Sequence, residues 1–218
     1  MSATLHYIYD PLCGWCYGAE PLVWSAAKAS DLELELHGGA LWPEPTRLPE
    51  PTRLYIRQAD QRIAQMSGQR FGPDYHNGLL LDPTMVLDSR PPTAAVLAAQ
   101  SIDRAKTLPM LRAIQHAHYE QGRRVVEREV LGDIAVEVGL DRAEFEAALS
   151  QAPVDEHIDE THRLMSLVGA NGFPTFVLQI AEDLYPVPHG RFASQPAQFR
   201  DWLEAQVEAQ IHAKAPAH

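Results

Sequence analysis

The sequence predicts an α/β fold in which a small mixed sheet with flanking helices is interrupted by an all-helical insertion. Strand-like segments occur only towards the two ends of the chain, and helical patterns fill the long middle. The sequence contains no internal repeat and no low-complexity tract. We therefore expect residues 1–45 and 169–218 to form one domain around the sheet, with residues 46–168 as a helical insertion domain.

The first part of the sheet domain is predicted to run strand, helix, strand. Residues 5–9 contain tyrosine and isoleucine, which suit a pleated surface, and Asp10-Pro11 ends this strand. A helix is expected over residues 17–29. Residues 32–37 alternate leucine with polar residues, and this period of two is typical of a half-buried strand.

The middle of the chain begins with a proline-rich segment, residues 43–51, which we interpret as a linker. Alanine-rich and amphipathic patterns, bounded by proline, glycine and capping residues, then predict a series of helices. These helices are expected over residues 52–67, 93–106, 109–121, 127–138 and 155–168, with a further short helix that begins at Asp141.

The strand signals return only after Asn171-Gly172. Strands are expected over residues 173–178 and 184–187, followed by a terminal helix over residues 195–211. The last part of the chain therefore completes the sheet that the first part begins.

The composition is that of an acidic globular protein. The 218 residues are 45% hydrophobic and include 18 Lys+Arg against 29 Asp+Glu, which gives a net charge of −11. An acidic surface repels phosphate backbones and anionic lipid headgroups, so we expect neither a nucleic-acid partner nor a membrane partner. The first residues lack the pattern of a secretory signal, and no segment is as long as a transmembrane helix. These features predict a cytoplasmic protein.

The only two cysteines, Cys13 and Cys16, are separated by two residues. A disulfide across so short a loop removes little entropy from the unfolded chain, so it would stabilise the fold weakly. A structural disulfide framework uses more cysteines at wider spacings. The pair therefore indicates redox chemistry.

The position of this CxxC, after a strand and at the start of a helix, favours a reactive thiolate. A helix N-terminus offers unpaired N–H donors and a positive dipole end, and such placements lower the pKa of a cysteine. We expect Cys13 to attack a substrate disulfide and Cys16, one turn deeper, to release the mixed disulfide. Trp15 is expected to cover the site or to touch the substrate.

Two other interpretations of the cysteine pair stay open. The pair could be half of a zinc site, but structural zinc needs four ligands, and the chain has no second CxxC and no histidine pair at a suitable spacing. Zinc shared across a dimer, or a chance inert pair, would need no further motif. We expect no metal site.

A second motif, Gly172-Phe173-Pro174-Thr175, lies where the sheet resumes. A proline at the head of a buried strand is awkward unless its bond or its position is special. A cis bond at Phe173–Pro174 would bring this loop near Cys13 and leave the backbone of Phe173 free to pair with an extended substrate. The alternative is an ordinary trans proline at an edge strand, and only about 5–6% of X–Pro bonds are cis.

Together these motifs resemble the DsbA-like branch of the thioredoxin superfamily, whose members have a CxxC, a helical insertion and a late cis-proline. The tracts 71–75, 82–83 and 86–92 resemble a bacterial subgroup of predicted protein-disulfide isomerases, and the similarity covers almost the whole chain. The resemblance implies a thioredoxin-like fold and dithiol–disulfide exchange on protein or peptide substrates. It implies that Cys13 is the nucleophile, Cys16 the resolving thiol and Pro174 the cis-proline. The neighbouring substrate contacts that it implies are Gly14, Trp15, Phe173 and Thr175.

The chain departs from the periplasmic oxidant of this family in two places. That oxidant has a buried glutamate six residues before its first cysteine, where this chain has Tyr7, and a proline and a histidine where this chain has Gly14 and Trp15. Both differences remove features linked to strong oxidising power. In a reducing cytosol we therefore expect reductase or isomerase behaviour. The active pair needs no cofactor, and glutathione is a candidate reductant.

Two further functions are open alternatives. Kappa-class glutathione transferases and hydroxychromene carboxylate isomerases resemble this architecture, but they generally have a serine where Cys13 stands and lack the second cysteine. The chain could also be a redox-sensing module that forms the Cys13–Cys16 bond without turning over. Steady-state turnover with a reductant distinguishes an enzyme from such a sensor.

Two other residues are weaker candidates for the site. Glu20, four residues after Cys16, shares its helix face and could accept its proton, although a solvated carboxylate in the first turns is the simpler interpretation. The turn His189-Gly190-Arg191 follows the last strand. Family similarity places this turn near the site, but a surface histidine beside a turn glycine is the favoured interpretation.

Overall fold

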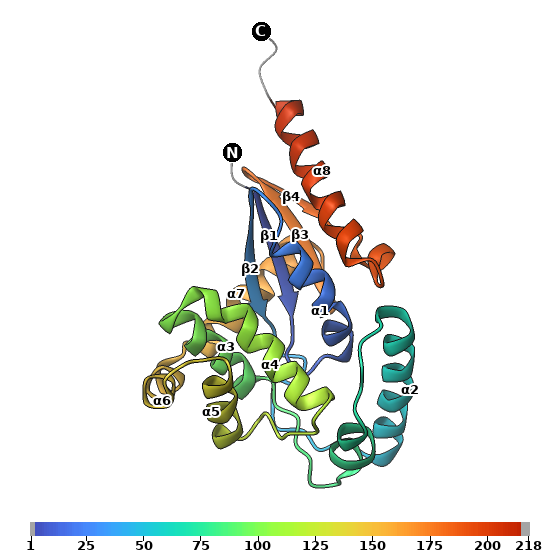
Figure 1. Cartoon of the computed structure of the whole chain (residues 1–218), viewed down its shortest axis with the longest axis vertical. Coiled ribbons are helices and arrows are strands. Elements are labelled where there is room, and N and C mark those ends of the chain that lie inside the picture. The colour runs from blue at the N-terminus through green and yellow to red at the C-terminus, as the bar shows by residue number, and fades with distance from the viewer. Residues whose placement is uncertain (1–2, 215–218) are drawn as a thin grey trace.

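A computed structural model describes residues 3–214, with side chains up to residue 210, and it has the predicted α/β architecture (Figure 1). The first part of the chain supplies β1 (Ala3–Tyr9) and β2 (Leu32–Gly38), and the last part supplies β3 (Thr175–Ile180) and β4 (Asp183–Pro186). The strand order is β2-β1-β3-β4. The sheet is mixed, because β1 runs parallel to β2 and antiparallel to β3, and β3 runs antiparallel to β4.

Helices cover the sheet on both faces. The helices α1 (Gly14–Ala26) and α8 (Pro196–Lys214) contact each other, and the Tyr7 hydroxyl of β1 donates to the carbonyl of Cys16 in α1 at 3.2 Å. On the opposite face, α7 (Val154–Leu167) contacts β2, and His157 Nε2 accepts the N–H of Gly38 at 2.9 Å. The central strand β1 is buried, and helices pack on both faces of the sheet that contains it.

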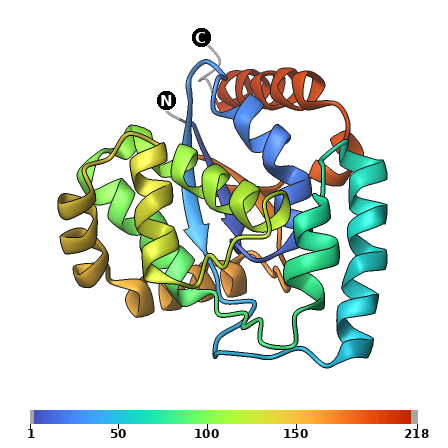
Figure 2. The ribbon, with the colours of Figure 1, turned by 60° about the horizontal axis from the view of Figure 1, so that its bottom comes forward.

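The helical insertion lies between β2 and β3. It contains α2 (Glu50–Ser67), α3 (Arg90–Ile102), α4 (Thr107–Tyr119), α5 (Arg128–Glu137) and α6 (Arg142–Gln151), and it ends with α7. Figure 2 shows α2 on one side of α1 and the group α3–α6 on the other. One hydrophobic core runs through both parts of the chain and includes Leu5 of the sheet and Ile114 of the insertion. Residues 46–168 as a separate domain stay a prediction.

Several predicted boundaries need correction. The first helix begins at Gly14 rather than residue 17, because Cys13 has an extended backbone that already caps it. The helix expected over residues 93–106 ends at Ile102, because Asp103 is extended and residues 104–106 form a 3₁₀ turn. The strand expected from residue 173 begins at Thr175, because Pro174 has no N–H to donate to a ladder.

The segment between α2 and α3 also contains short helices that the sequence did not predict. A π-helical turn, Asp74–Gly78, is followed by a 3₁₀ turn, Leu79–Leu81. Tyr75, Leu79 and Leu80 are buried, so this segment contributes to the core rather than acting as an open loop.

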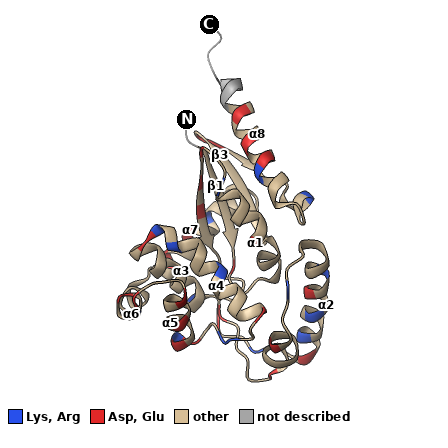
Figure 3. Ribbon diagram, viewed as in Figure 1, with Lys and Arg blue, Asp and Glu red and all other residues tan. Residues whose placement is uncertain are grey.

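The surface agrees with the acidic composition. Acidic side chains occur on α2, α5, α6 and α8 (Figure 3), so the negative charge is not confined to one element. Within residues 3–214, none of the helices combines the length and the apolar character that a membrane crossing requires.

Candidate active site

Cys13 lies at the N-terminal tip of α1. Its backbone is extended, with φ −97° and ψ 114°, and its N–H donates to the Asp10 carbonyl at 3.2 Å. The Cys13 carbonyl accepts the first helical hydrogen bond, from the N–H of Tyr17 at 3.0 Å. The helix begins at Gly14, so the sulfur stands where the unpaired N–H groups and the positive dipole end of α1 are found.

The second motif lies directly beside this sulfur. The Phe173–Pro174 peptide bond is cis, and Cys13 Sγ lies 3.7 Å from the Phe173 carbonyl oxygen, although 160 residues separate the two. The Thr175 hydroxyl donates to the Gly172 carbonyl at 2.8 Å, which closes the turn before β3. The structure therefore brings together the two motifs that the sequence singled out.

The two cysteines differ in burial. Cys16 is fully buried, whereas Cys13 keeps 5% of its surface exposed, and both are free thiols. Burial raises the pKa of Cys16 well above its ordinary value, and the neighbouring Cys13 and the Asp10 carboxyl raise it further. The Asp10 N–H, 3.5 Å from Cys16 Sγ, lowers this pKa by only part of that amount. Cys16 is thus held as a protonated thiol behind Cys13. Neighbouring residues also cover most of Cys13.

A mainly apolar groove of about 380 Å³ runs past the site. Trp15 of α1 and Ile63 of α2 line it from the helices, and Phe173 and Pro174 line it from the turn that precedes β3. Trp15 is 41% exposed, so it stands at the rim rather than closing the site completely. His189, which the sequence favoured as a surface residue of a turn, also lines this groove.

Asp10 is a site residue that sequence reasoning missed. It is fully buried three residues before Cys13, its Oδ1 accepts the N–H of Leu12, and its Oδ2 accepts the N–H of Leu41, each at 2.8 Å. Burial raises the pKa of this carboxyl to about 6, against a lowering by the hydrogen bonds that it accepts. An aspartate before a proline has the sequence pattern of a strand breaker, and only the burial of Asp10 distinguishes it from one.

Asp60 of α2 is a second buried carboxyl that the sequence did not indicate. It lines a cavity of about 280 Å³ that also reaches Gly14 and Trp15. Its Oδ2 accepts the Tyr75 hydroxyl at 3.2 Å and lies 3.5 Å from His76 Nε2, and burial raises the pKa of Asp60 to about 7. A Cβ atom at Gly14 would lie 3.0 Å from Asp60 Oδ1, so the glycine of the CxxC allows α2 to approach closely.

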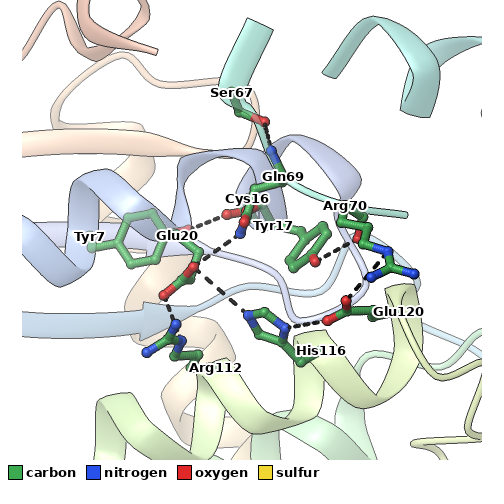
Figure 4. Close-up of polar contacts among 10 residues, drawn as sticks. All are labelled: Tyr7, Cys16, Tyr17, Glu20, Ser67, Gln69, Arg70, Arg112, His116 and Glu120. Atoms are coloured by element: carbon green, nitrogen blue, oxygen red, sulfur yellow. Dashed lines mark hydrogen bonds and ion pairs between the residues drawn. The ribbon is translucent and has the colours of Figure 1, made fainter. Parts of the chain in front are cut away.

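Glu20 takes part in a buried polar network rather than facing solvent (Figure 4). Its carboxylate lies 3.0 Å from Arg112 Nε and accepts a hydrogen bond from Gln69 Nε2 at 3.0 Å. Hydrogen bonding to Glu20 is also the main reason why the pKa of His116 is raised. The interpretation of Glu20 as a solvated carboxylate is therefore wrong. Within residues 3–210, its polar contacts do not include Cys16.

Comparisons with known proteins agree with this geometry. The family model described as "DSBA-like thioredoxin domain" matches residues 4–189. No curated protein matches the chain. A structure titled "Cytosolic disulfide reductase DsbM from Pseudomonas aeruginosa" is 45% identical, with a TM-score of 0.87, and the match covers 94% of this chain and 99% of that one. The same protein has also been solved with GSH, with a TM-score of 0.84, 45% identity and the same two coverages.

More distant structures show the fold alone. A candidate protein disulfide isomerase from Nitrosomonas europaea is 23% identical with a TM-score of 0.82, and the match covers 96% of this chain and 99% of that one. A 2-hydroxychromene-2-carboxylate isomerase is 15% identical with a TM-score of 0.60, and the match covers 98% of this chain and 100% of that one. The family match over most of the chain and the 45% identity lead to one assignment. This chain belongs to the DsbA-like thioredoxin family and is a thiol–disulfide oxidoreductase.

Proposed function

We propose that this chain is a cytosolic reductase of protein or peptide disulfides, with Cys13 as nucleophile and Cys16 as resolving thiol. One observation carries the proposal: Cys13 Sγ stands at the tip of α1, 3.7 Å from the Phe173 carbonyl, with Cys16 fully buried behind it. Cys13 keeps 5% of its surface exposed at the helix tip and can meet a substrate, whereas the fully buried Cys16 can meet only Cys13. The pair is therefore suited to attack followed by internal release.

The proposed reaction moves two electrons from the cysteine pair to the substrate. The Cys13 thiolate attacks one sulfur of a substrate disulfide, forms a mixed disulfide, and releases the other sulfur, which takes up a proton. Cys16 then loses its proton and attacks the Cys13 sulfur. This step closes the Cys13–Cys16 bond and releases the second substrate thiol.

The proton of Cys16 needs an acceptor inside the protein. Glu20, the acceptor suggested by the sequence, is engaged with Arg112 and Gln69. The Asp10 carboxyl is close enough to raise the pKa of Cys16, and its own pKa of about 6 leaves it mostly ionised at neutral pH. Asp10 is therefore the better-placed acceptor.

The groove of about 380 Å³ supports a peptide substrate. Trp15 and Pro174 supply apolar parts of its lining, and the Phe173 carbonyl oxygen lies 3.7 Å from the Cys13 sulfur. An extended peptide can place its disulfide over Cys13 while its main chain pairs with this backbone. Gly14 and Thr175 complete the proposed contact surface.

Glutathione is the proposed reductant. The 45% identical Pseudomonas aeruginosa protein is described as cytosolic and has been solved with GSH. Two glutathione molecules would reduce the Cys13–Cys16 bond through a glutathionyl mixed disulfide, and they would leave as one glutathione disulfide. The same exchange chemistry would also support disulfide isomerisation.

Reduction of insulin disulfides tests the proposal, with glutathione or dithiothreitol as the electron source. Wild type should accelerate insulin precipitation, Cys13→Ser should abolish the acceleration, and Cys16→Ser should accumulate a mixed disulfide visible by mass spectrometry. Equal rates for wild type and Cys13→Ser would refute the assignment. Glutathione conjugation that survives loss of both thiols would instead favour the transferase or isomerase alternative.

A further inference from the structure

Two histidines and a glutamate, none of them part of the thiol site, meet on the sheet. His6 lies on β1 directly opposite Glu35 of β2, and His37 follows two residues later on β2. Residues two apart on a strand point to the same face, so these three side chains share one face of the sheet. Tyr7, the neighbour of His6, points to the opposite face and bonds to Cys16. The sheet therefore separates the cluster from the cysteines.

The three donor atoms are spaced as the ligands of a small divalent cation are. His6 Nδ1 lies 2.9 Å from His37 Nε2, and Glu35 Oε2 lies 3.6 Å from the first nitrogen and 3.8 Å from the second. A point equidistant from three atoms at these separations lies about 2.0 Å from each, and zinc binds histidine nitrogen and carboxylate oxygen at about 2.0–2.2 Å. An ion at the centre of this triangle would lie at bonding distance from all three atoms once each imidazole ring turns so that its nitrogen faces the ion instead of the other ring.

A second group orients the histidine on β1. His6 Nε2 lies 2.7 Å from Gln179 Oε1, and the Gln179 amide nitrogen donates to the Ala181 carbonyl at 3.0 Å. The Gln179 oxygen therefore faces His6 and requires the proton on Nε2, which leaves the Nδ1 lone pair directed at His37. Metal-binding histidines typically donate their second ring N–H to such an acceptor. In the protein without metal, His37 Nε2 donates to this lone pair, and binding of a cation through Nε2 would require the His37 tautomer that carries its proton on Nδ1.

The cluster is accessible from one side. Glu35 and His37 line a cavity of about 520 Å³ at the β2 edge of the sheet, whereas His6 is 8% exposed. Arg104 pairs with the other oxygen of the carboxylate: its Nη2 lies 3.9 Å from Glu35 Oε1, whereas Oε2 faces the histidines. Water from the cavity can therefore occupy a fourth coordination position.

We propose that His6, Glu35 and His37 form a site for a divalent cation of the Zn²⁺ type, held by two imidazoles, one carboxylate and water. Imidazole with carboxylate suits zinc better than it suits calcium or magnesium, which take all-oxygen ligand sets. The site uses neither cysteine, so it stands independently of the proposed reductase activity. It also differs from the sequence expectation that the chain has no metal site.

Calorimetric titration of Zn²⁺ into the tag-free Cys13→Ser/Cys16→Ser chain tests the site without competing thiolates. We expect one equivalent to bind, His37→Gln to weaken binding at least tenfold, and the control His162→Gln, an exposed histidine of α7, to change it less than twofold. Glu35→Gln, at a half-exposed position, gives the same test if circular dichroism shows that His37→Gln is misfolded. Failure of the parent chain to bind zinc, or an equal loss in His162→Gln, would overturn the proposal.

The coordination shell gives a second readout. X-ray absorption at the zinc edge of the loaded double serine variant should show only nitrogen and oxygen neighbours at about 2.0–2.2 Å. The same measurement on Glu35→Gln should show fewer protein ligands or no bound zinc. A spectrum of fully hydrated zinc in the parent chain would refute the site.

Discussion

Replacing the buried Asp60 by asparagine is predicted to stabilise the protein at high pH and to change the pH dependence of its stability. The Asp60 side chain is 2% exposed, and burial raises its pKa from 3.8 to about 7. At pH values between 3.8 and about 7, Asp60 has lost its proton in the unfolded chain and has kept it in the folded chain. Stability therefore falls as pH rises through this window and levels off above about pH 7.

The magnitude follows from the width of the window. The free energy of unfolding falls by about 1.4 kcal/mol for each pH unit in which one group holds a proton only in the folded state. From pH 3.8 to about 7 this slope gives an upper limit of about 4 kcal/mol for Asp60. An asparagine side chain at this position would carry no such cost and would still accept the Tyr75 hydroxyl through its amide oxygen. We expect Asp60→Asn to exceed wild type by about 2–4 kcal/mol at pH 8 and to match it near pH 4.

Urea unfolding of the reduced protein at several pH values between 4 and 8 measures this effect. The buried Asp10, with a pKa of about 6, adds a similar slope to every variant, so only the difference between wild type and Asp60→Asn isolates Asp60. Asp159→Asn, an exposed position of α7, is the matched control and should follow wild type at every pH. A constant separation between wild type and Asp60→Asn across this range would refute the reasoning.

Further predictions concern the thiols and their surroundings. Iodoacetamide should label Cys13 in the folded protein and Cys16 only after unfolding, because Cys16 is fully buried; mass spectrometry of peptides checks this, and early labelling of Cys16 would contradict it. Gly39→Ala should lower insulin reduction, because a Cβ atom there would lie 2.2 Å from the Phe173 ring and push the loop from Cys13. Unchanged kinetics in this variant would count against the proposed role of the loop. Glu20→Gln should lower the urea unfolding free energy by about 1–2 kcal/mol, since it breaks the ion pair between the buried Glu20 and the half-exposed Arg112, and a change below about 0.5 kcal/mol would show that the pair contributes little. The reduction potential against glutathione should be more negative than about −200 mV, and a value near about −120 mV would contradict a reductase.

The meeting of the two active-site motifs could be expected from the sequence because strand order alone produces it. The cysteine pair follows the end of β1, and Pro174 precedes the start of β3. These strands are antiparallel neighbours, with Ile8 opposite Thr175, so the end of one lies beside the start of the other. Short-range patterns locate both strands, and sheet topology then places the motifs together.

The buried carboxyls could not be predicted in the same way. Asp60 lies on a helix whose sequence has polar residues on several faces, and its burial depends on how α2 packs against Gly14 and Tyr75. Asp10 has the local pattern of a strand breaker, and its role depends on backbone groups that the chain brings back after β2. Both effects depend on tertiary contacts, which cannot be deduced from the periodicity of residues along the chain.

These carboxyls bear on the direction of electron flow. A strong oxidant of this family stabilises its reduced, thiolate-bearing form. In this chain burial and the neighbouring Cys13 raise the pKa of Cys16, with a smaller contribution in the same direction from the Asp10 carboxyl, and Asp60 lies against the residue that follows Cys13. At neutral pH the Asp10 carboxylate, and Asp60 in the fraction of molecules that has lost its proton, oppose further negative charge on the reduced pair but act less on an uncharged disulfide. Tyr7, where the periplasmic oxidant has glutamate, has its pKa raised well above its ordinary value by burial and stays neutral. These electrostatics support the proposed reductase direction, in which the pair gives electrons to a substrate.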